Sequence, residues 1–142
     1  MNRILLFALV FSGLHLVSCT RETANQETGA ARLVETYSVF TGNNRAHYEF
    51  STAGKTVSAT VDHYYNHPTG DKSTSGSLAT IFEALTGAPP ESPNDYQTLE
   101  SIFPLLEDNG WVVIDDKKQD DPDASGLQST IRTVNLRRKP AN

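Results

Sequence analysis

Apolar and polar residues alternate along three successive segments between Leu33 and Tyr65. This period of two is typical of β-strands with one buried face. The first segment ends near Thr41, before turn-forming residues at positions 42–44, and the second and third cover about residues 46–51 and 56–65. The pattern therefore predicts three strands in sequence.

A hairpin closed by residues 52–55 would bring the second and third strands together. In that register apolar residues lie opposite apolar residues three times, in the pairs Phe50–Val57, Tyr48–Ala59 and Ala46–Val61. Such cross-strand pairs fix the register, because a slip by one residue would turn every apolar side chain outward.

The hydrophobic period changes to that of an amphipathic helix after a polar loop at residues 66–76. Four apolar residues show the helical spacing i, i+3, i+4, i+7: Leu78, Ile81, Phe82 and Leu85. Ser75 or Ser77 can cap the start of this helix, and Gly87 can cap its end.

A second helix is expected to begin near Asn94 or Asp95. Its predicted buried side consists of Tyr96, Leu99, Ile102, Phe103 and Leu106. Pro104 either kinks this helix or lies in the first turn of a separate short helix capped by Ser101. The dipeptide Asn109-Gly110 ends the helix in both cases.

The last third of the chain predicts two more strands. Residues 111–114 form a short buried strand, residues 115–126 an acidic loop, and residues 127–138 a last strand. The alternation slips between Ile131 and Val134, which indicates a bulge or a strong twist there. The predicted fold class is α+β: a mainly antiparallel sheet of about five strands with one or two helices packed on one face, in the order β-β-β-α-α-β-β.

The predicted helix end at Asn109-Gly110-Trp111 is followed by two strands, of which the second ends at Leu136-Arg137-Arg138-Lys139. This half of the chain resembles a small bacterial αβ domain family without assigned function. The resemblance implies no catalytic residues.

The N-terminal segment is apolar from Ile4 to Val17, with few exceptions, and follows the basic residue Arg3. Its end, Leu16-Val17-Ser18-Cys19, resembles the lipobox of bacterial lipoproteins. The resemblance implies a signal peptide at residues 1–18, cleavage before Cys19, and a lipid on the Cys19 thiol with a further acyl chain, such as palmitate, on the new amino terminus. Residues 19–31 would then be the lipidated cysteine and a flexible tether, and residues 32–142 a single globular domain.

The lipoprotein resemblance also implies a location. The protein is expected in the cell envelope, attached to a membrane through its lipid. Thr20, where aspartate would favour the inner membrane, favours the outer membrane if the host has two. Cys19 is the only cysteine, so its acylation would leave the domain without disulfides, cysteine nucleophiles or thiolate metal sites.

The formal net charge of −5 argues against a nucleic-acid partner, which requires a basic surface. The run Arg137-Arg138-Lys139 is the one local exception, and we interpret it as a solvated strand end.

One motif in the acidic loop suggests calcium. Asp121, Asp123 and Ser125 precede Gly126 with a spacing that resembles the opening of an EF-hand loop. Arg132 occupies the position where that loop needs a bidentate glutamate, so no metal cofactor is expected. A lipoprotein that binds calcium, glycans or another small ligand through residues 115–126 is the alternative hypothesis.

The histidines suggest a weaker metal hypothesis. His63 and His67 are four residues apart, but in the predicted register His47 lies opposite Thr60, on the other face of the sheet from His63. This geometry argues against a three-histidine zinc site and leaves His63 and His67 with Asp71 as an alternative.

No sequence motif supports nucleophilic catalysis or a phosphate loop. We therefore expect a non-enzymatic domain that binds a protein or other envelope component. The candidate contact surface is the loop at residues 66–76 and the outward face of the third strand: Thr56, Ser58, Thr60, Asp62 and Tyr64.

Overall fold

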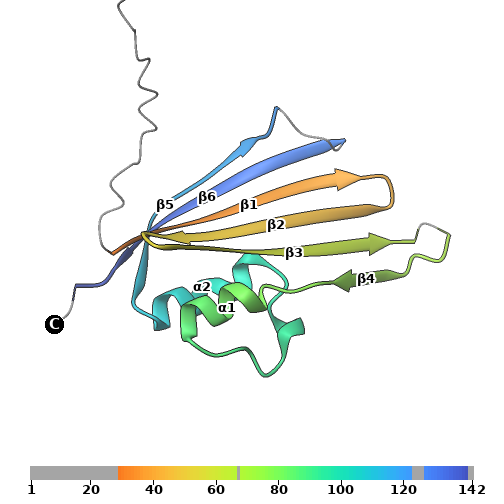
Figure 1. Ribbon diagram of the computed structural model, residues 1–142. Helices are drawn as coiled ribbons and strands as arrows, with labels where there is room; N and C mark the ends of the chain where they lie inside the picture. Colours follow the sequence, from red (N-terminus) through yellow and green to blue (C-terminus); the bar gives the residue numbers. More distant parts are fainter. Residues whose placement is uncertain (1–28, 67, 123–126, 141–142) are drawn as a thin grey trace, which may run out of the picture.

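The computed structural model describes residues 29–66, 68–122 and 127–140. All neighbouring strands are antiparallel in one six-stranded sheet of order β4-β3-β2-β1-β6-β5 (Figure 1). The elements in chain order are β1 (Ala30–Phe40), β2 (Asn43–Thr52), β3 (Lys55–Tyr65), β4 (Lys72–Ser75), α1 (Ala79–Thr86), a 3₁₀ turn (Pro93–Asp95), α2 (Leu99–Asp108), β5 (Trp111–Asp120) and β6 (Gln128–Arg138).

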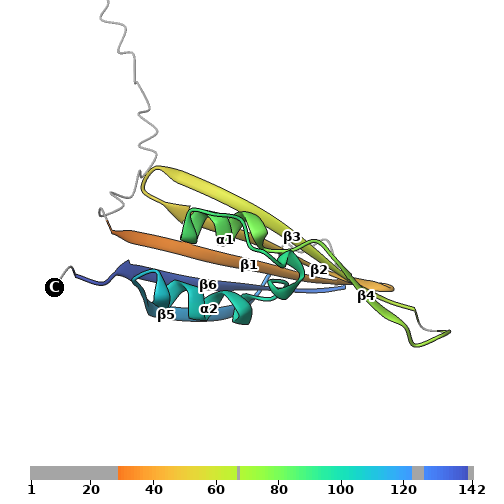
Figure 2. The same cartoon turned by 90° about the horizontal axis from the view of Figure 1, so that it is seen from below.

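The two helices form a second layer on one face of the sheet (Figures 1 and 2). They connect the two edge strands, since β4 precedes α1 and β5 follows α2. The expected α+β class with a mainly antiparallel sheet is thus confirmed, but the sheet has six strands instead of about five. The additional strand is β4, within the segment that we expected to be a loop.

The predicted pairing of β2 with β3 is confirmed at every position. Phe50 lies opposite Val57, Tyr48 opposite Ala59, and Ala46 opposite Val61. All six side chains face the helices, so burial on one face fixes this register.

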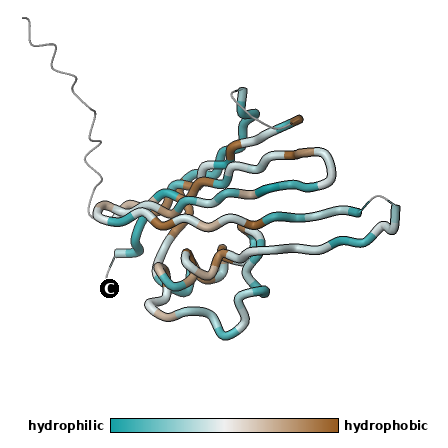
Figure 3. The backbone as a smooth tube through the Cα atoms, turned by 45° about the vertical axis from the view of Figure 1, so that its right-hand side comes forward, coloured by the Kyte–Doolittle hydropathy of each residue, from teal (hydrophilic) through white to brown (hydrophobic). Residues whose placement is uncertain are grey.

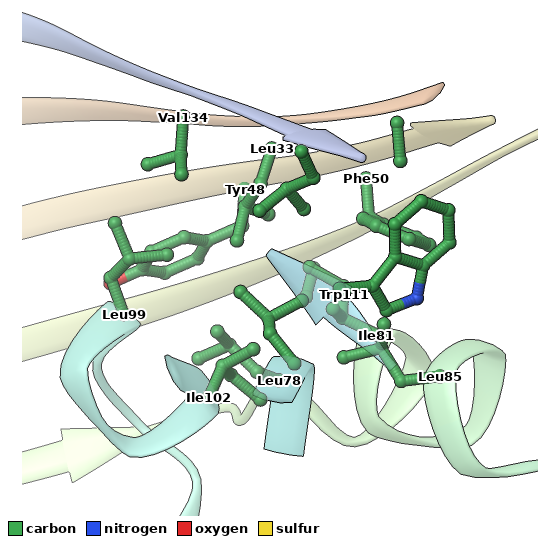
Figure 4. Close-up of a cluster of buried hydrophobic side chains, with 14 of the residues drawn as sticks. Leu33, Tyr48, Phe50, Leu78, Ile81, Leu85, Leu99, Ile102, Trp111 and Val134 are labelled. Carbon is green, nitrogen blue, oxygen red and sulfur yellow. The ribbon is translucent and has the colours of Figure 1, made fainter. Parts of the chain in front are cut away.

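The hydrophobic core fills the space between the helices and one half of the sheet (Figure 4). The rings of Phe50 and Trp111 meet edge to face, with centroids 6.1 Å apart. The fully buried side chains include Leu33, Tyr48, Val61, Leu78, Ile81, Leu99, Ile102, Leu106, Val134 and Leu136. Figure 3 shows hydrophobic positions where sheet and helices meet.

Helix α1 follows the sequence prediction in its buried face and its end, but its N-cap is Leu78 and not Ser75 or Ser77. Leu78, Ile81 and Leu85 are buried, whereas Phe82 is half-buried and packs on Tyr96, with ring centroids 4.6 Å apart. Gly87 ends the helix with a φ of 85°, a left-handed conformation that favours glycine.

Helix α2 begins later than predicted. The segment near Asn94 and Asp95 forms the 3₁₀ turn, and the helix starts at Leu99. Pro104 lies inside one helix, so the alternative of a separate helix capped by Ser101 is wrong. The Ser101 hydroxyl instead donates to the Thr98 carbonyl.

Strand β5 differs most from its prediction. It continues through Asp120, so residues 115–120 belong to a strand and not to a loop. Its pairing with β6 shifts between Val113 and Asp115, which places a bulge at Ile114. The predicted bulge in the last strand is wrong, because β6 pairs with β1 without interruption.

Strand β1 begins at Ala30, and the side chain of Ala31 is buried, so the sheet starts two residues before the expected domain boundary. The predicted signal peptide and Cys19 lie outside the described residues. We call the end of the sheet with Gly29, the turn between β2 and β3, and Arg138 the proximal end. The opposite end, with the β1–β2 turn and the β3–β4 hairpin, is the distal end (Figure 1).

Candidate binding surface

The five residues predicted as the outward face of β3 do lie together on the side of the sheet away from the helices. They alternate with core residues along the strand, as Thr60 does between Ala59 and Val61. The structure therefore brings Thr56, Ser58, Thr60, Asp62 and Tyr64 to one surface.

Polar contacts to β2 hold this surface in place. Thr60 Oγ1 lies 3.1 Å from His47 Nδ1. Arg45 donates from Nε and Nη2 to the two oxygens of Asp62 at 2.7 and 3.3 Å. This hydrogen-bonded charge pair raises the pKa of Arg45. The surface is thus polar, with ordered side chains.

The β3–β4 hairpin extends this surface beyond the helices at the distal end (Figures 1 and 2). Tyr64 and Tyr65 are exposed, at 44% and 41% of their surface. The Lys72 ammonium lies 5.9 Å from the centre of the Tyr65 ring. These side chains line part of a hollow of about 430 Å³, together with Asn44, His63, Ser73 and Thr74.

Backbone hydrogen bonds explain why this hairpin keeps its shape. The amide of Tyr65 donates to the Gly42 carbonyl at 3.1 Å, and that of Asn66 to the Asp71 carbonyl at 2.9 Å. β4 pairs only with β3, and its side chains are all exposed and polar. Hydrophobic periodicity therefore gave no signal for this strand.

The histidines occupy separate places. His47 lies opposite Thr60 on the outer face, whereas His63 lies on the helix-facing side with its Nδ1 3.2 Å from Thr74 Oγ1. The predicted separation of His47 from His63 is confirmed. His67 lies outside the described residues, so the hypothesis of a site with Asp71 stays a prediction.

The acidic segment that was considered as a calcium site does not form a single loop in the structure. Asp115 and Asp116 lie in β5, where Asp115 binds the Lys117 ammonium at 2.8 Å. The amide of Asp121 donates to the Ser129 carbonyl at 3.0 Å. Asp123 and Ser125 lie outside the described residues. Across residues 29–66, 68–122 and 127–140, no group of three or more metal-ligating side chains gathers.

Arg132 has a role that sequence reasoning missed. Its guanidinium binds both oxygens of Asp116 at 2.8 and 2.9 Å and the Glu100 carboxylate at 2.8 Å. It also lies 5.2 Å from the centre of the Phe103 ring. Arg132 thus joins β6, β5 and α2. The available signal was its position two residues before Val134, which places both on the helix-facing side.

These contacts shift the pKa of each partner. The hydrogen bond from Arg132 lowers the pKa of Asp116. The pKa of Glu100 is lowered by its own backbone amide and then by Arg132. Asp116 chiefly raises the pKa of Arg132. Beside this group, burial and a hydrogen bond with Glu35 raise the pKa of the Tyr48 phenol. These groups are paired with one another, which is typical of a structural network.

The first half of β5 is exposed rather than buried as predicted. Trp111 is buried, but Val112, Val113 and Ile114 are exposed at 39%, 43% and 56%. β5 is an edge strand, and the bulge turns Ile114 out of the regular alternation. Arg138 covers Trp111, with its guanidinium carbon 4.1 Å from the ring centre.

Comparisons of this chain with protein-family models, with curated proteins and with solved structures find no match. In the described part of the chain, neither helix has the length and apolar character needed to cross a membrane.

Proposed function

We propose that the protein is a lipid-anchored cell-envelope protein whose small, non-catalytic domain binds another envelope component, such as a protein, through the distal end of its sheet. The observation that carries this proposal is the separation of two ends. The chain enters the fold at Gly29, beside Arg138, whereas the exposed tyrosines of the β3–β4 hairpin lie at the opposite end (Figure 1).

The distance from the anchor to the domain is short in sequence. Ten residues separate Cys19 from Ala30, so the fully extended chain between these two residues spans at most about 40 Å. An acyl anchor on Cys19 would therefore hold the proximal end near the membrane. The distal hairpin would then point away from it, toward partners in the aqueous compartment.

The chemistry of the distal end suits binding. Exposed tyrosines combine a large apolar surface with a hydroxyl group, and they contribute strongly at interfaces. The ionised side chains in the described part whose pKa values are shifted are engaged in ion pairs, as Asp116 and Arg132 are. This engagement supports a binding domain in preference to an enzyme.

Site-specific photo-crosslinking in intact cells tests the binding site. A photoreactive tyrosine analogue at Tyr64 or Tyr65 should give discrete adducts, and the same analogue at the exposed residue Glu91, in the loop before the 3₁₀ turn, should give none. Equal adducts at all three positions would contradict the proposal. Unlabelled wild-type protein should compete for the adducts, and unlabelled Tyr64→Ala protein should not. This pair of results would establish specificity.

The anchor has its own test. Cys19→Ala should abolish labelling by a metabolic fatty-acid probe and release the protein from membranes or leave it unprocessed. Labelling that persists in this variant would show that the lipid is not on Cys19.

A further inference from the structure

We infer that the proximal end carries a docking surface for an anionic lipid membrane, made by Arg32, Lys55, Val112, Ile114 and Arg137. We call these five residues the proximal patch. The inference rests on the proposed lipid anchor and adds an orientation to it: the domain lies against the membrane instead of hanging freely from its tether.

Strand pairing places Arg32, Arg137 and Val112 on the neighbouring strands β1, β6 and β5, and Lys55 at the same end of the sheet on β3. Arg137 lies opposite Ala30 on one side and Val112 on the other. Arg32 lies opposite Ser51, and Lys55 opposite Thr52, at the same end of the sheet. By strand register, Arg32, Val112 and Arg137 lie on the face away from the helices, which no described helix or strand covers (Figure 1).

The cations of the proximal patch differ from most other cations of the domain. Arg45, Lys117, Arg132 and Lys139 each bind a carboxylate. In contrast, the ion pairs between described residues include none with Arg32, Lys55 or Arg137. Although the chain is acidic overall, this end therefore presents uncompensated positive charge.

Apolar side chains stand beside these cations. Val112 and Ile114 are exposed at 39% and 56%. Ile114 lines the same hollow as Gly29 and Arg137, so this apolar surface adjoins the point where the chain enters the fold. Exposed aliphatic groups with flanking lysine or arginine are the combination that binds the interface of an anionic bilayer.

The anchor supplies the remaining argument. The ten residues between Cys19 and the fold keep the start of β1 within about 40 Å of Cys19. At that range, weak contacts suffice for docking, because the attachment makes them intramolecular. Each lysine or arginine near an anionic surface changes the ratio of docked to undocked domains by about fivefold.

Spin labels on the full acylated protein test this orientation. Cys19 is the only cysteine, so its acylation leaves Val112→Cys or Thr69→Cys as a single labelling site, at the proximal or distal end respectively. The labelled proteins are reconstituted into vesicles of phosphatidylcholine alone or with phosphatidylglycerol. We expect residue 112, and not residue 69, to be protected from a water-soluble relaxation agent in the anionic vesicles only.

Salt and charge variants sharpen this result. Protection at residue 112 should disappear in 1 M salt, where screening acts over about 3 Å, while the acyl anchor keeps the protein on the vesicle. Arg137→Gln should lower the docked ratio about fivefold, and Arg32→Gln with Arg137→Gln about 25-fold. Lys118→Gln, which removes the same charge from a helix-facing position of β5, is the matched control and should have no effect.

The inference would be overturned by equal exposure of both labels in acylated protein, or by protection that does not depend on lipid charge. Protection at residue 112 in detergent without vesicles would assign the patch to a second copy of the chain and would also overturn it. Failure of the anchor is recognised separately, because mass spectrometry would then find Cys19 without acyl chains.

Discussion

The proximal and distal ends of the sheet share five strands, with β4 at the distal end alone, and they are stabilised differently. Strand β1 contributes Leu33 to the buried core at one end and Val39, half-buried, near the other. At the proximal end, apolar side chains fill the space between the sheet and the two helices. At the distal end, the strands extend beyond the helices (Figures 1 and 2).

The distal end depends on hydrogen bonds in place of a core. Arg45 binds Asp62, and Ser129 donates to the Ser38 hydroxyl at 2.7 Å. The hydrogen bond between the two hydroxyls contributes about 1 kcal/mol, whereas burial of a leucine contributes about 2 kcal/mol. Substitutions at the distal end should therefore cost little stability, which leaves residues there available for binding.

A matched pair of leucine substitutions gives the largest expected contrast. Leu33→Ala should reduce the free energy of unfolding by about 2–5 kcal/mol, because Leu33 is fully buried and its removal leaves a cavity. Leu127→Ala should change it by about 0.5 kcal/mol or less, since Leu127 is 77% exposed at the distal end. Urea unfolding measures both. Similar losses would show that the two ends do not differ.

Gly76 connects the hairpin to α1, and its replacement should give the next largest effect. Its φ is +87°, and a Cβ there would lie 2.2 Å from the Thr60 carbonyl oxygen. Gly76→Ala should therefore cost about 2–4 kcal/mol, from the strained backbone and the displacement of β3.

Gly42 is the matched control for Gly76, because its φ is +85° but no atom lies within 4 Å of a Cβ placed there. Gly42→Ala should cost only about 1–2 kcal/mol, from the backbone conformation alone. Equal losses in thermal and urea melts would show that the close approach to Thr60 has no energetic weight.

The same contrast explains which parts of the fold the sequence could predict. At the proximal end, burial on one face dictates residue type, so the β2–β3 register and the spacing Leu78–Ile81–Leu85 were readable. Gly87 marked the end of α1 because only glycine adopts its φ readily. Where a core forms, the periodicity of the chain carries the information.

Elsewhere the pattern carried little information. Strand β4 is polar on both faces, and β5 carries Asp115 to Lys118 in a strand because ion pairs, such as that between Asp116 and Arg132, compensate their charge. Such pairs join residues distant in sequence, so local propensity favours a loop instead. The outward residues of β3 were predicted correctly as one face, whereas residues 66–76 were expected to extend this surface as a loop and not as the hairpin with β4.

Arg132 on β6 contacts both β5 and α2, and its replacement tests this connection between the sheet and the helix. Arg132→Met should reduce stability near neutral pH by about 1–2 kcal/mol, because it leaves Asp116 and Glu100 without their shared cation. Urea unfolding at several pH values measures the effect.

The pH dependence of this loss has a defined sign. The folded pKa values of Asp116 and Glu100 are lowered, so their contribution is present above their unfolded pKa values of about 4. It is lost as the pH falls further, through the folded values. The difference between wild type and Arg132→Met should thus shrink below about pH 4. A difference that stays constant would assign the effect to lost packing on Phe103.

Tyr48→Phe should give the smallest change. Tyr48 is buried, and its hydroxyl bonds Glu35 where the core meets the polar half of the sheet. Loss of this hydrogen bond should cost about 0.5–1.5 kcal/mol near neutral pH, because the half-buried Glu35 can regain water.

The raised pKa of the Tyr48 phenol means that its contribution to stability is complete below the unfolded pKa of about 10 and declines as the pH rises toward the folded value. Wild-type stability should therefore fall above about pH 10, and more steeply than that of Tyr48→Phe. Tyr64→Phe, which alters an exposed ring at the distal end, should leave the wild-type profile unchanged in the same urea melts. If the free energy of unfolding fell equally with rising pH in wild type and in Tyr48→Phe, Tyr48 would not link the core to the polar half of the sheet.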